Sequence, residues 1–541
     1  MRLRGPLVLG AAVLSLLAPL ASSSAVGGPG PLAGAAGVTH RVEKLCPSNG
    51  QRVACEAIRQ TDPAPPSLAP NVTGSGVAPA VIPSGYGPAD LRSAYNLTGS
   101  GSPAMTVAIV DAYDDPSAES DLAAYRSTYG LPSCTVGNGC FRKVNQAGNA
   151  SPLPPPDAGW AGEISLDLDM VSAICPGCRI LLLEGQDASI ASLGTAVNTA
   201  VGMGARFVSN SYGAPETGSA NSYDASYYNH PGVVITASSG DGGYGVSYPA
   251  SGTGVTAVGG TSLRRSSSPR GWAETAWSGA GSGCSGSVPQ PRFQAGLTTG
   301  CAKRAEADVA AVSDPQTGVA VYQSYTSSTT SPGWQVYGGT SAAAPIIASI
   351  YALAGNPGPT DSPNAYPYAH TLNLFDVTTG NNGACGAPLC TAGPGYDGPT
   401  GLGTPNGTGA FTFPSSSSGF IAVGPTRVLD TRNGTGAPPG QVGPGGTLTL
   451  TMPNLPAGVT GVILNLTGTN LNGADPTYVS ACPAAQTVPT CAQTSAINPY
   501  RGVNIANQLT VPVAADGKIR LYNAAGNIDL IADLAGYLTS S

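Results

Sequence analysis

The sequence predicts an α/β domain with a mostly parallel sheet and helices on both faces, followed by a small all-β, sandwich-like domain. Two observations support this. Between residues 105 and 263, short apolar runs alternate with stretches of helical periodicity. After residue 420 the pattern changes to period-two alternation with Asp-Gly and Ala-Gly turns. We therefore place the α/β domain at 84–413, a Pro/Ser linker at 414–419 and the all-β domain at 420–541.

The elements follow in order from these patterns. Five apolar segments of the first domain are predicted strands, and two segments between them are predicted helices. The strands are MTVAIVDAY, CRILLLEG, ARFVSNSYG, GVVITASSGD and GVTAVGGTSL, and the helices are LAAYRSTYG and SLGTAVNTAVGMG. The predicted strand segments of the second domain are TLTLTMPNL, GVILNLTGTN, NQLTVPVAADGKIRLYNAAG and NIDLIADLAGYL. Ligands of parallel sheets bind beyond the carboxyl ends of the strands, so functional loops should follow the strands of the first domain.

The N-terminus has the pattern of a secretory signal peptide at residues 1–25. A basic MRLR start precedes an apolar run over 7–21 and a small-residue cleavage site at 23–25. The apolar run is short for a membrane span, so we expect no membrane span after cleavage. The Gly/Ala/Pro-rich residues 26–83 that follow are predicted to be a linker or a short propeptide-like segment.

Cysteine spacing and charge agree with a secreted, extracellular protein. The twelve cysteines fall into six close pairs, which suggests neighbour disulfides. The pairs are Cys46/Cys55, Cys134/Cys140, Cys175/Cys178, Cys284/Cys301, Cys385/Cys390 and Cys482/Cys491. The Cys-x-x-Cys spacing of Cys175 and Cys178 leaves catalysis of thiol exchange open as an alternative. A net charge of −7 argues against nucleic acid as a partner, and only 10% charged residues suggest tolerance of acid.

The segment VYGGTSAAAP places Ser341 at the start of a helix-forming run of small residues, where subtilisin-like peptidases carry their nucleophile. Such a serine needs a base. The chain has three histidines, His40, His230 and His370, and none lies in the His-Gly-Thr setting of a subtilisin-type base. The base is therefore sought among carboxylates.

Glu163 and Asp167 lie four residues apart in a segment with helical spacing, so they share one helix face, whereas Asp169 points elsewhere. A Glu held by a neighbouring Asp can take the serine proton, and carboxylic acids suit acidic conditions. Asp241 follows a predicted buried strand, where a protonated acid could donate a hydrogen bond to an oxyanion. The alternative for Glu163 and Asp167 is an ordinary pair of solvated acidic residues on a helix, and the alternative for Asp241 is a turn residue before Gly-Gly.

The motifs GEISLDLD, SSGDGG and GGTSAAAP resemble, in this order, those of the sedolisin family of serine-carboxyl peptidases, and the similarity extends over most of residues 84–413. The resemblance implies a subtilisin-like fold with Ser341 as nucleophile, Glu163 as base, Asp167 as its orienting partner and Asp241 as the oxyanion-hole acid. Asp111, in AIVDAYDD, is assigned to a loop or substrate role because it lacks a histidine partner.

The family resemblance also implies one structural Ca²⁺ ion. Its implied ligands in LFDVTTG and GPGYDG are the side chains of Asp376 and Asp397 and the carbonyls of Val377, Gly393 and Gly395. Oxygen ligands suit calcium, and an ordinary Gly/Pro/Asp loop is the alternative. Members of the family typically carry a large N-terminal prodomain, whereas about 60 residues separate the predicted signal from the peptidase-like domain here.

We therefore expect a secreted, acid-active serine-carboxyl endopeptidase that forms an acyl-enzyme at Ser341 on protein or peptide substrates. Two other functions remain open: a catalytically silent scaffold that presents a surface-binding module, and a tripeptidyl-peptidase. The C-terminal domain, with RVLDTRNGTG and IADLAGYL, is similar to β modules of secreted bacterial proteins. It could bind a cell wall or polysaccharide surface, or act as a spacer.

Overall fold

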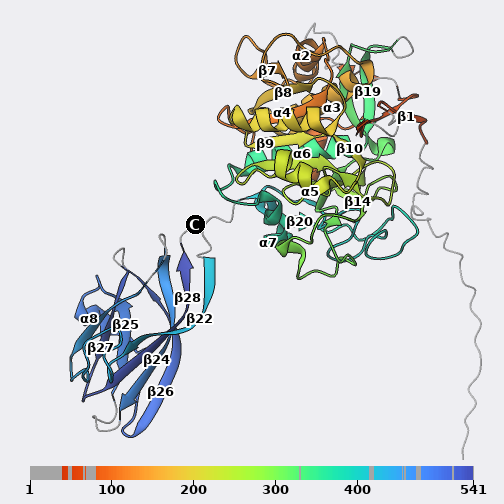
Figure 1. Cartoon of the computed structure of the whole chain (residues 1–541). Coiled ribbons are helices and arrows are strands. Elements are labelled where there is room, and N and C mark those ends of the chain that lie inside the picture. The colour runs from red at the N-terminus through yellow and green to blue at the C-terminus, as the bar shows by residue number, and fades with distance from the viewer. Residues whose placement is uncertain are drawn as a thin grey trace, which may run out of the picture.

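The computed structural model of the chain is drawn in Figure 1. It describes residues 39–46, 52–64, 67–68, 81–327, 331–412, 419–453, 455, 459–470, 477–513 and 517–539. The predicted signal peptide at residues 1–25 lies outside the described residues, as does the predicted Pro/Ser linker at 414–419 except residue 419.

The first domain is built on a sheet of eight strands in the order β14-β13-β11-β9-β6-β8-β7, with β17 also paired to β13. All pairs are parallel except β13 with β14. The strands are β6 (Thr106–Ala112), β7 (Phe141–Asn145), β8 (Arg179–Gly185), β9 (Phe207–Asn210), β11 (Val234–Ser238), β13 (Thr256–Arg265), β14 (Trp272–Ala276) and β17 (Val309–Val312). The predicted strands of this domain are thereby confirmed.

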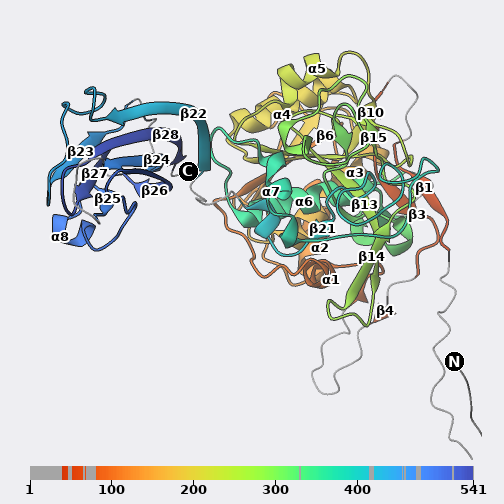
Figure 2. The ribbon, with the colours of Figure 1, turned by 90° about the horizontal axis from the view of Figure 1, so that it is seen from below.

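Helices cover both faces of this sheet. Successive side chains of β6 alternate between two cores: Val107 and Ile109 pack into the core that holds α3 (Ala158–Ile174) and α6 (Thr340–Ala354), whereas Ala108 and Val110 pack into the core that holds α4 (Ile190–Gly202). Figure 2 shows these helices from below. The other helices are α1 (Pro88–Ala94), α2 (Ala118–Thr128), α5 (Ala220–Tyr223), α7 (Tyr366–Ala369) and α8 (Val488–Cys491).

Helix α3 begins and ends where its sequence dictates. The Asp157 carboxylate accepts hydrogen bonds from the backbone N–H groups of Gly159 (2.9 Å) and Trp160 (3.0 Å), which satisfies two N–H groups that have no partner within the helix. Pro176 follows the C-cap at Cys175, and proline cannot continue the helix. Every residue from Trp160 to Ile174 is buried, so the three carboxyl groups on this helix, those of Glu163, Asp167 and Asp169, lie inside the protein.

The N-terminal segment contributes strands to two further sheets, which the sequence did not predict. These sheets run β1-β3-β19-β18 and β12-β10-β2. Their strands are β1 (Val42–Lys44), β2 (Ala54–Cys55), β3 (Ile58–Gln60), β10 (Tyr212–Pro215), β12 (Ser247–Tyr248), β18 (Val319–Gln323) and β19 (Gly333–Gly338). Small two-stranded sheets are formed by β4 (Ser67–Leu68) with β5 (Val81–Ile82), β15 (Gly283–Cys284) with β16 (Ala305–Glu306), and β20 (Leu374–Phe375) with β21 (Thr404–Pro405).

The C-terminal domain consists of two antiparallel sheets, β22-β28-β24-β26 and β23-β27-β25. Its strands are β22 (Gly419–Asp430), β23 (Thr447–Thr451), β24 (Val459–Asn470), β25 (Val479–Pro483), β26 (Val503–Pro512), β27 (Lys518–Asn523) and β28 (Asp529–Thr539). Leu450 and Leu521 of the second sheet share one core with Leu464 and Leu530 of the first. The predicted sandwich-like domain is confirmed.

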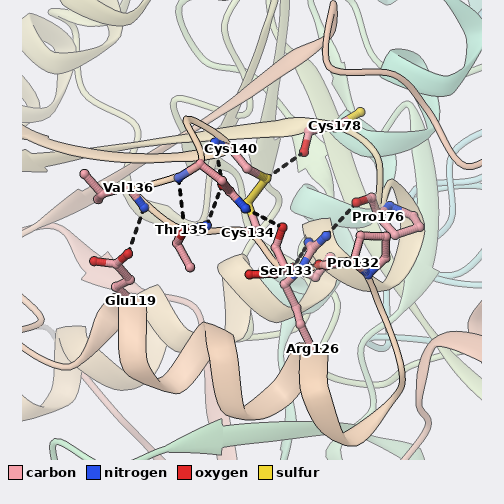
Figure 3. The surroundings of a disulfide bond; sticks show 12 residues. Glu119, Arg126, Pro132, Ser133, Cys134, Thr135, Val136, Cys140, Pro176 and Cys178 are labelled. Carbon is pink, nitrogen blue, oxygen red and sulfur yellow. Dashed lines mark hydrogen bonds between the residues drawn. A yellow bond between two sulfur atoms is a disulfide. The ribbon is translucent and has the colours of Figure 1, made fainter.

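All six predicted disulfides are present. Figure 3 shows the disulfide Cys134–Cys140 and, beside it, the buried Arg126 of α2. Its guanidinium donates to the carbonyl of Pro132 (2.6 Å), beside Cys134–Cys140, and to the carbonyl of Pro176 (2.6 Å), within Cys175–Cys178. Cys175 and Cys178 are fully buried and disulfide-bonded, which supports a structural role.

Among the described residues, no helix combines the length and the apolar character that a membrane span requires.

Candidate active site

Ser341 is the second residue of α6, directly after a tight backbone turn. Gly339 precedes the helix with a φ of 93°, a conformation that glycine adopts without strain. A β-carbon at Gly339 would lie 1.9 Å from the Glu56 carbonyl oxygen and 2.6 Å from Asp241 Oδ2. Glycine is therefore required both by the turn and by the close approach of these two oxygens.

Glu163 and Asp167 lie on α3, which packs against α6. Both residues are fully buried. Neither carboxyl oxygen of Glu163 accepts a hydrogen bond of ordinary length from a described residue, although the Ser341 hydroxyl is close enough to favour the charged form of this carboxyl group. The structure thus brings the predicted nucleophile and the predicted base together.

Ser211, between β9 and β10, joins these groups. Its hydroxyl donates to the Asp167 carboxylate (2.7 Å to Oδ1 and 2.9 Å to Oδ2), and its carbonyl accepts from the Ser341 hydroxyl at 3.2 Å. The sequence analysis missed Ser211. The only available signal was its position beyond a predicted buried strand, in SNSYG.

The buried acids have strongly shifted acidities. Burial raises the pKa of Glu163 well above its usual range, and the neighbouring charges of Asp167 and Asp111 raise it further. Burial also raises the pKa of Asp167, as does Asp111, while the Ser211 hydroxyl lowers it. In acid these groups are therefore protonated or share protons, which removes the repulsion between them.

The structure corrects the assignment of Asp111 to a loop. Asp111 is part of β6, is fully buried, and acts electrostatically on both Glu163 and Asp167. Burial raises its own pKa to about 8. The carboxyl end of this central strand lies where ligands of parallel sheets bind, so the position itself was predictable, whereas the contact with the acid pair was not.

Asp241 follows β11 in the chain and bonds to Thr340, the first residue of α6. Its Oδ1 accepts hydrogen bonds from the backbone N–H (2.7 Å) and the hydroxyl (2.9 Å) of Thr340, while Oδ2 has no hydrogen-bond partner among the described residues. Burial raises the pKa of Asp241 to about 7. A proton on Oδ2 would therefore be retained in acid and would be free to be donated.

The other predicted positions lie away from this site. The Asp169 carboxylate accepts from the Tyr322 backbone N–H at 2.9 Å, so it faces β18, as the helical spacing predicted. The three histidines bond elsewhere: His40 to the Asp62 carbonyl (3.0 Å), His230 to Asn198 (2.8 Å) and His370 to the Tyr366 carbonyl (3.1 Å). The search for a base among carboxylates is consistent with this placement.

The residues implied for calcium form a compact loop region. Asp376 Oδ2 accepts from the Gly395 N–H at 2.9 Å, and Asp397 Oδ2 accepts from the Gly393 N–H at 3.2 Å. The negative charge of Asp376 is near enough to raise the pKa of Asp397. Two close carboxylates suit a hard cation in donor chemistry. Among the described residues, clusters of three or more His, Cys, Asp or Glu that could hold a metal are absent.

The fold is that of a subtilisin-like domain, and the carboxyl group of Glu163 lies next to Ser341, whereas the three histidines bond elsewhere. A model of the subtilase family matches residues 157–372. Kumamolisin of a Bacillus species is 31% identical over 350 residues, 58% of this chain and 59% of kumamolisin. Aorsin of Aspergillus oryzae is 44% identical over 75 residues, 13% of this chain and 12% of aorsin.

A solved structure of Pseudomonas sedolisin, a serine-carboxyl proteinase complexed with two molecules of pseudo-iodotyrostatin, is also similar. It matches with a TM-score of 0.50 and 26% identity, over 60% of this chain and 96% of that one. Over about three fifths of its length, the chain is therefore similar to kumamolisin and to the serine-carboxyl proteinase sedolisin. It spans about three fifths of the length of kumamolisin.

Proposed function

We propose that this chain is a secreted, acid-active serine-carboxyl endopeptidase that hydrolyses peptide bonds through an acyl-enzyme at Ser341. The observation that carries the proposal is the convergence of four buried side chains, Ser341, Glu163, Asp167 and Asp241, from three separate segments of the fold. Six disulfides support an extracellular location.

Each residue then has a defined task. Glu163 takes the Ser341 hydroxyl proton as Oγ attacks the carbonyl carbon, and later gives this proton to the leaving amine. Asp167, held by Ser211, keeps Glu163 in place and shares protons with it. The oxyanion accepts hydrogen bonds from the Ser341 N–H and from protonated Asp241 Oδ2. Water then releases the acyl group by the same route in reverse.

The cleft favours an endopeptidase over a tripeptidyl-peptidase. One Aspergillus fumigatus relative, tripeptidyl-peptidase sed1, is 43% identical over 75 residues, 13% of this chain and 12% of that protein. In this chain, however, the carbonyl of Glu56 accepts from the Ser341 N–H at 3.2 Å, and the same segment continues back through β2, paired with β10, to Val53, the third residue before Glu56. Val53 is held there by a hydrogen bond from its N–H to the Ala188 carbonyl at 3.0 Å. A cleft that accommodates chain at this position does not require a free substrate N-terminus.

The first test is the pH–rate profile for digestion of a denatured protein, with Ser341→Ala measured alongside. We expect hydrolysis in acid that is lost as the pH rises through about 7, because Asp241, whose pKa burial raises to about 7, must keep its proton to donate to the oxyanion. We expect Ser341→Ala to reduce kcat/KM by about 10³-fold or more. A folded wild-type chain that is inactive at every pH would favour the silent scaffold instead.

We further propose that Asp376, Asp397 and the carbonyls of Val377, Gly393 and Gly395 hold one Ca²⁺ ion. The ion would stabilise the loop by neutralising its two carboxylates. Because a ligand that binds only the folded state stabilises it, calcium at a hundredfold excess over its Kd should add about 2.7 kcal/mol and raise Tm by about 5 °C.

Thermal unfolding with calcium and with a chelator measures this effect. Asp376→Asn should abolish the shift in Tm, whereas Asp187→Asn, at an exposed position bonded to Ser189, should preserve it. The same Tm with and without calcium in the wild type would rule out the site.

A further inference from the structure

The loop that carries Asp241 is braced by a second backbone segment. Residues 279–282 run beside residues 240–245 and share three backbone hydrogen bonds with them. The bonds run from the Gly281 N–H to the Gly240 carbonyl (2.7 Å), from the Gly243 N–H to the Gly279 carbonyl (2.9 Å) and from the Gly245 N–H to the Ser282 carbonyl (2.7 Å). The position of Asp241 therefore depends on the position of residues 279–282.

Asn382, which lies between β20 and β21, holds both segments. Its side chain is buried, and the side-chain amide donates to the Ala280 carbonyl at 2.6 Å and to the Ser282 hydroxyl at 2.8 Å. Its own carbonyl accepts from the Tyr244 N–H at 3.0 Å. One residue thus bonds directly to the loop that carries Asp241 and also to the segment that braces this loop.

Asn382 is itself held in place by the loop that the disulfide Cys385–Cys390 closes. Its N–H donates to the Cys390 carbonyl at 2.9 Å. The Ser282 hydroxyl, which accepts from Asn382, donates in turn to the Leu389 carbonyl at 2.9 Å. The amide group is therefore oriented before any substrate binds, and little order has to be gained during the reaction.

The direction of the free oxygen of Asp241 is set mainly by its backbone. Oδ1 is fixed by its two bonds to Thr340, whereas Oδ2 has no hydrogen-bond partner among the described residues. The proposed mechanism assigns Oδ2 to the oxyanion. Donors of this kind act because they are already aimed at the developing charge, and loss of one typically costs about 10² to 10³ in kcat.

We propose that Asn382 is a positioning residue for the oxyanion-hole acid: it fixes residues 240–245 and 280–282 so that Asp241 is aimed at the reacting carbonyl and shielded from water. The inference rests on the proposed peptidase function and adds to it a residue that does not touch the substrate. Removing the amide would leave the Ala280 carbonyl without this donor and would loosen the loop at Gly240.

A loosened loop should also change the pH at which Asp241 loses its proton. Burial is the main reason why the pKa of Asp241 is raised to about 7, so entry of water should lower this pKa toward the usual range. The charged or titratable groups that act electrostatically on Asp241 or are affected by it are Glu56, Lys44 and Glu163. The bonds of Asn382 go to other residues, so its removal leaves these three groups in place.

The test compares Asn382→Ala with Asn364→Ala. Asn364 is also buried, and its amide donates to the carbonyls of Thr253 (2.8 Å) and Val255 (3.4 Å), outside the loop that carries Asp241. Both variants should lower Tm. Asn382→Ala should in addition lower kcat about tenfold or more with KM changed less than about threefold, because the oxyanion forms only during the reaction.

The pH–rate profile for hydrolysis of a soluble peptide separates positioning from stability. In Asn382→Ala the pH at which activity is half lost on the alkaline side should move toward acid by about one unit or more, whereas in Asn364→Ala it should stay. Asn382→Asp provides a second variant of the same size, whose carboxyl group donates only while protonated. Its alkaline midpoint should also move toward acid.

Two results would overturn this inference alone: a wild-type alkaline midpoint in both Asn382 variants, or equal shifts in Asn364→Ala and Asn382→Ala. If Asn382→Ala does not fold, the midpoint of Asn382→Asp decides. A wild-type chain without Ser341-dependent hydrolysis at any pH would instead overturn the proposed function, and this inference with it.

Discussion

Replacing Glu163 by glutamine should lower kcat/KM by about 10³-fold or more while leaving the fold unchanged. Glutamine keeps the size of the buried side chain but cannot take a proton from Ser341, and a positioned base contributes about 10² to 10⁴ in rate. Peptide hydrolysis at the acidic optimum measures the loss, and circular dichroism checks the fold. Full activity in Glu163→Gln would mean that another group accepts the serine proton.

The matched control is Asp169→Asn on the same helix. Asp169 is buried like Glu163, but its carboxylate accepts from the Tyr322 backbone N–H, away from Ser341. An asparagine oxygen can still accept that bond, so activity should change by less than about threefold. A comparable loss in both variants would show that the Glu163 effect reflects damage to α3 rather than loss of the base.

The peptidase domain should be most stable in acid and should lose stability as the pH rises. Burial raises the pKa of Asp111 to about 8, of Asp241 and Asp115 to about 7 and of Glu184 to about 9. The folded state thus binds protons more tightly than the unfolded chain. Stability is fully present below the unfolded pKa near 4 and is lost as the pH rises through about 7 to 9.

Thermal unfolding of the Ser341→Ala chain, which cannot digest itself, measures this trend. Tm should fall by about 10 °C between pH 4 and 8, since several groups each contribute an energy on the order of kcal/mol. Asp111→Asn should flatten the decline, because it removes one of the groups that must ionise inside the protein. A Tm that rises over this range would contradict the expectation.

The stability of the C-terminal domain should depend on pH in the opposite direction. Hydrogen bonds from Arg432 lower the pKa of Asp430 to about 2, so this group contributes stability above pH 4 that is lost as the pH falls through about 2. A separate C-terminal transition in the same scans should therefore weaken only in strong acid.

Periodic patterns allowed much of the peptidase fold and the acid pair to be predicted. Glu163 and Asp167 share a face because helices repeat every 3.6 residues, and this local rule needs no knowledge of the partner helix. The segment at Glu56 offered no such pattern. Its strands are two or three residues long and exist because they pair with β10 and β19, which lie far away in the sequence. Pairing of this kind depends on tertiary contacts rather than on local preference.

The influence of Asp111 on the acid pair could not be predicted from the sequence for the same reason. Its place at the end of a buried strand was predictable, but its effect on Glu163 and Asp167 depends on how α3 lies over β6. Ser211 likewise acts through two groups, a hydroxyl on Asp167 and a carbonyl next to Ser341, that only the folded chain brings together.

The disulfides have a further consequence for an enzyme surrounded by copies of itself. Each joins cysteines only 3 to 17 residues apart, so each removes little entropy from the unfolded chain as a whole. Their effect is local, because each holds a short loop closed. Exposed loops are where proteolytic nicking begins. We therefore expect these short bridges to slow nicking of the loops that they close more than they shift the folding equilibrium.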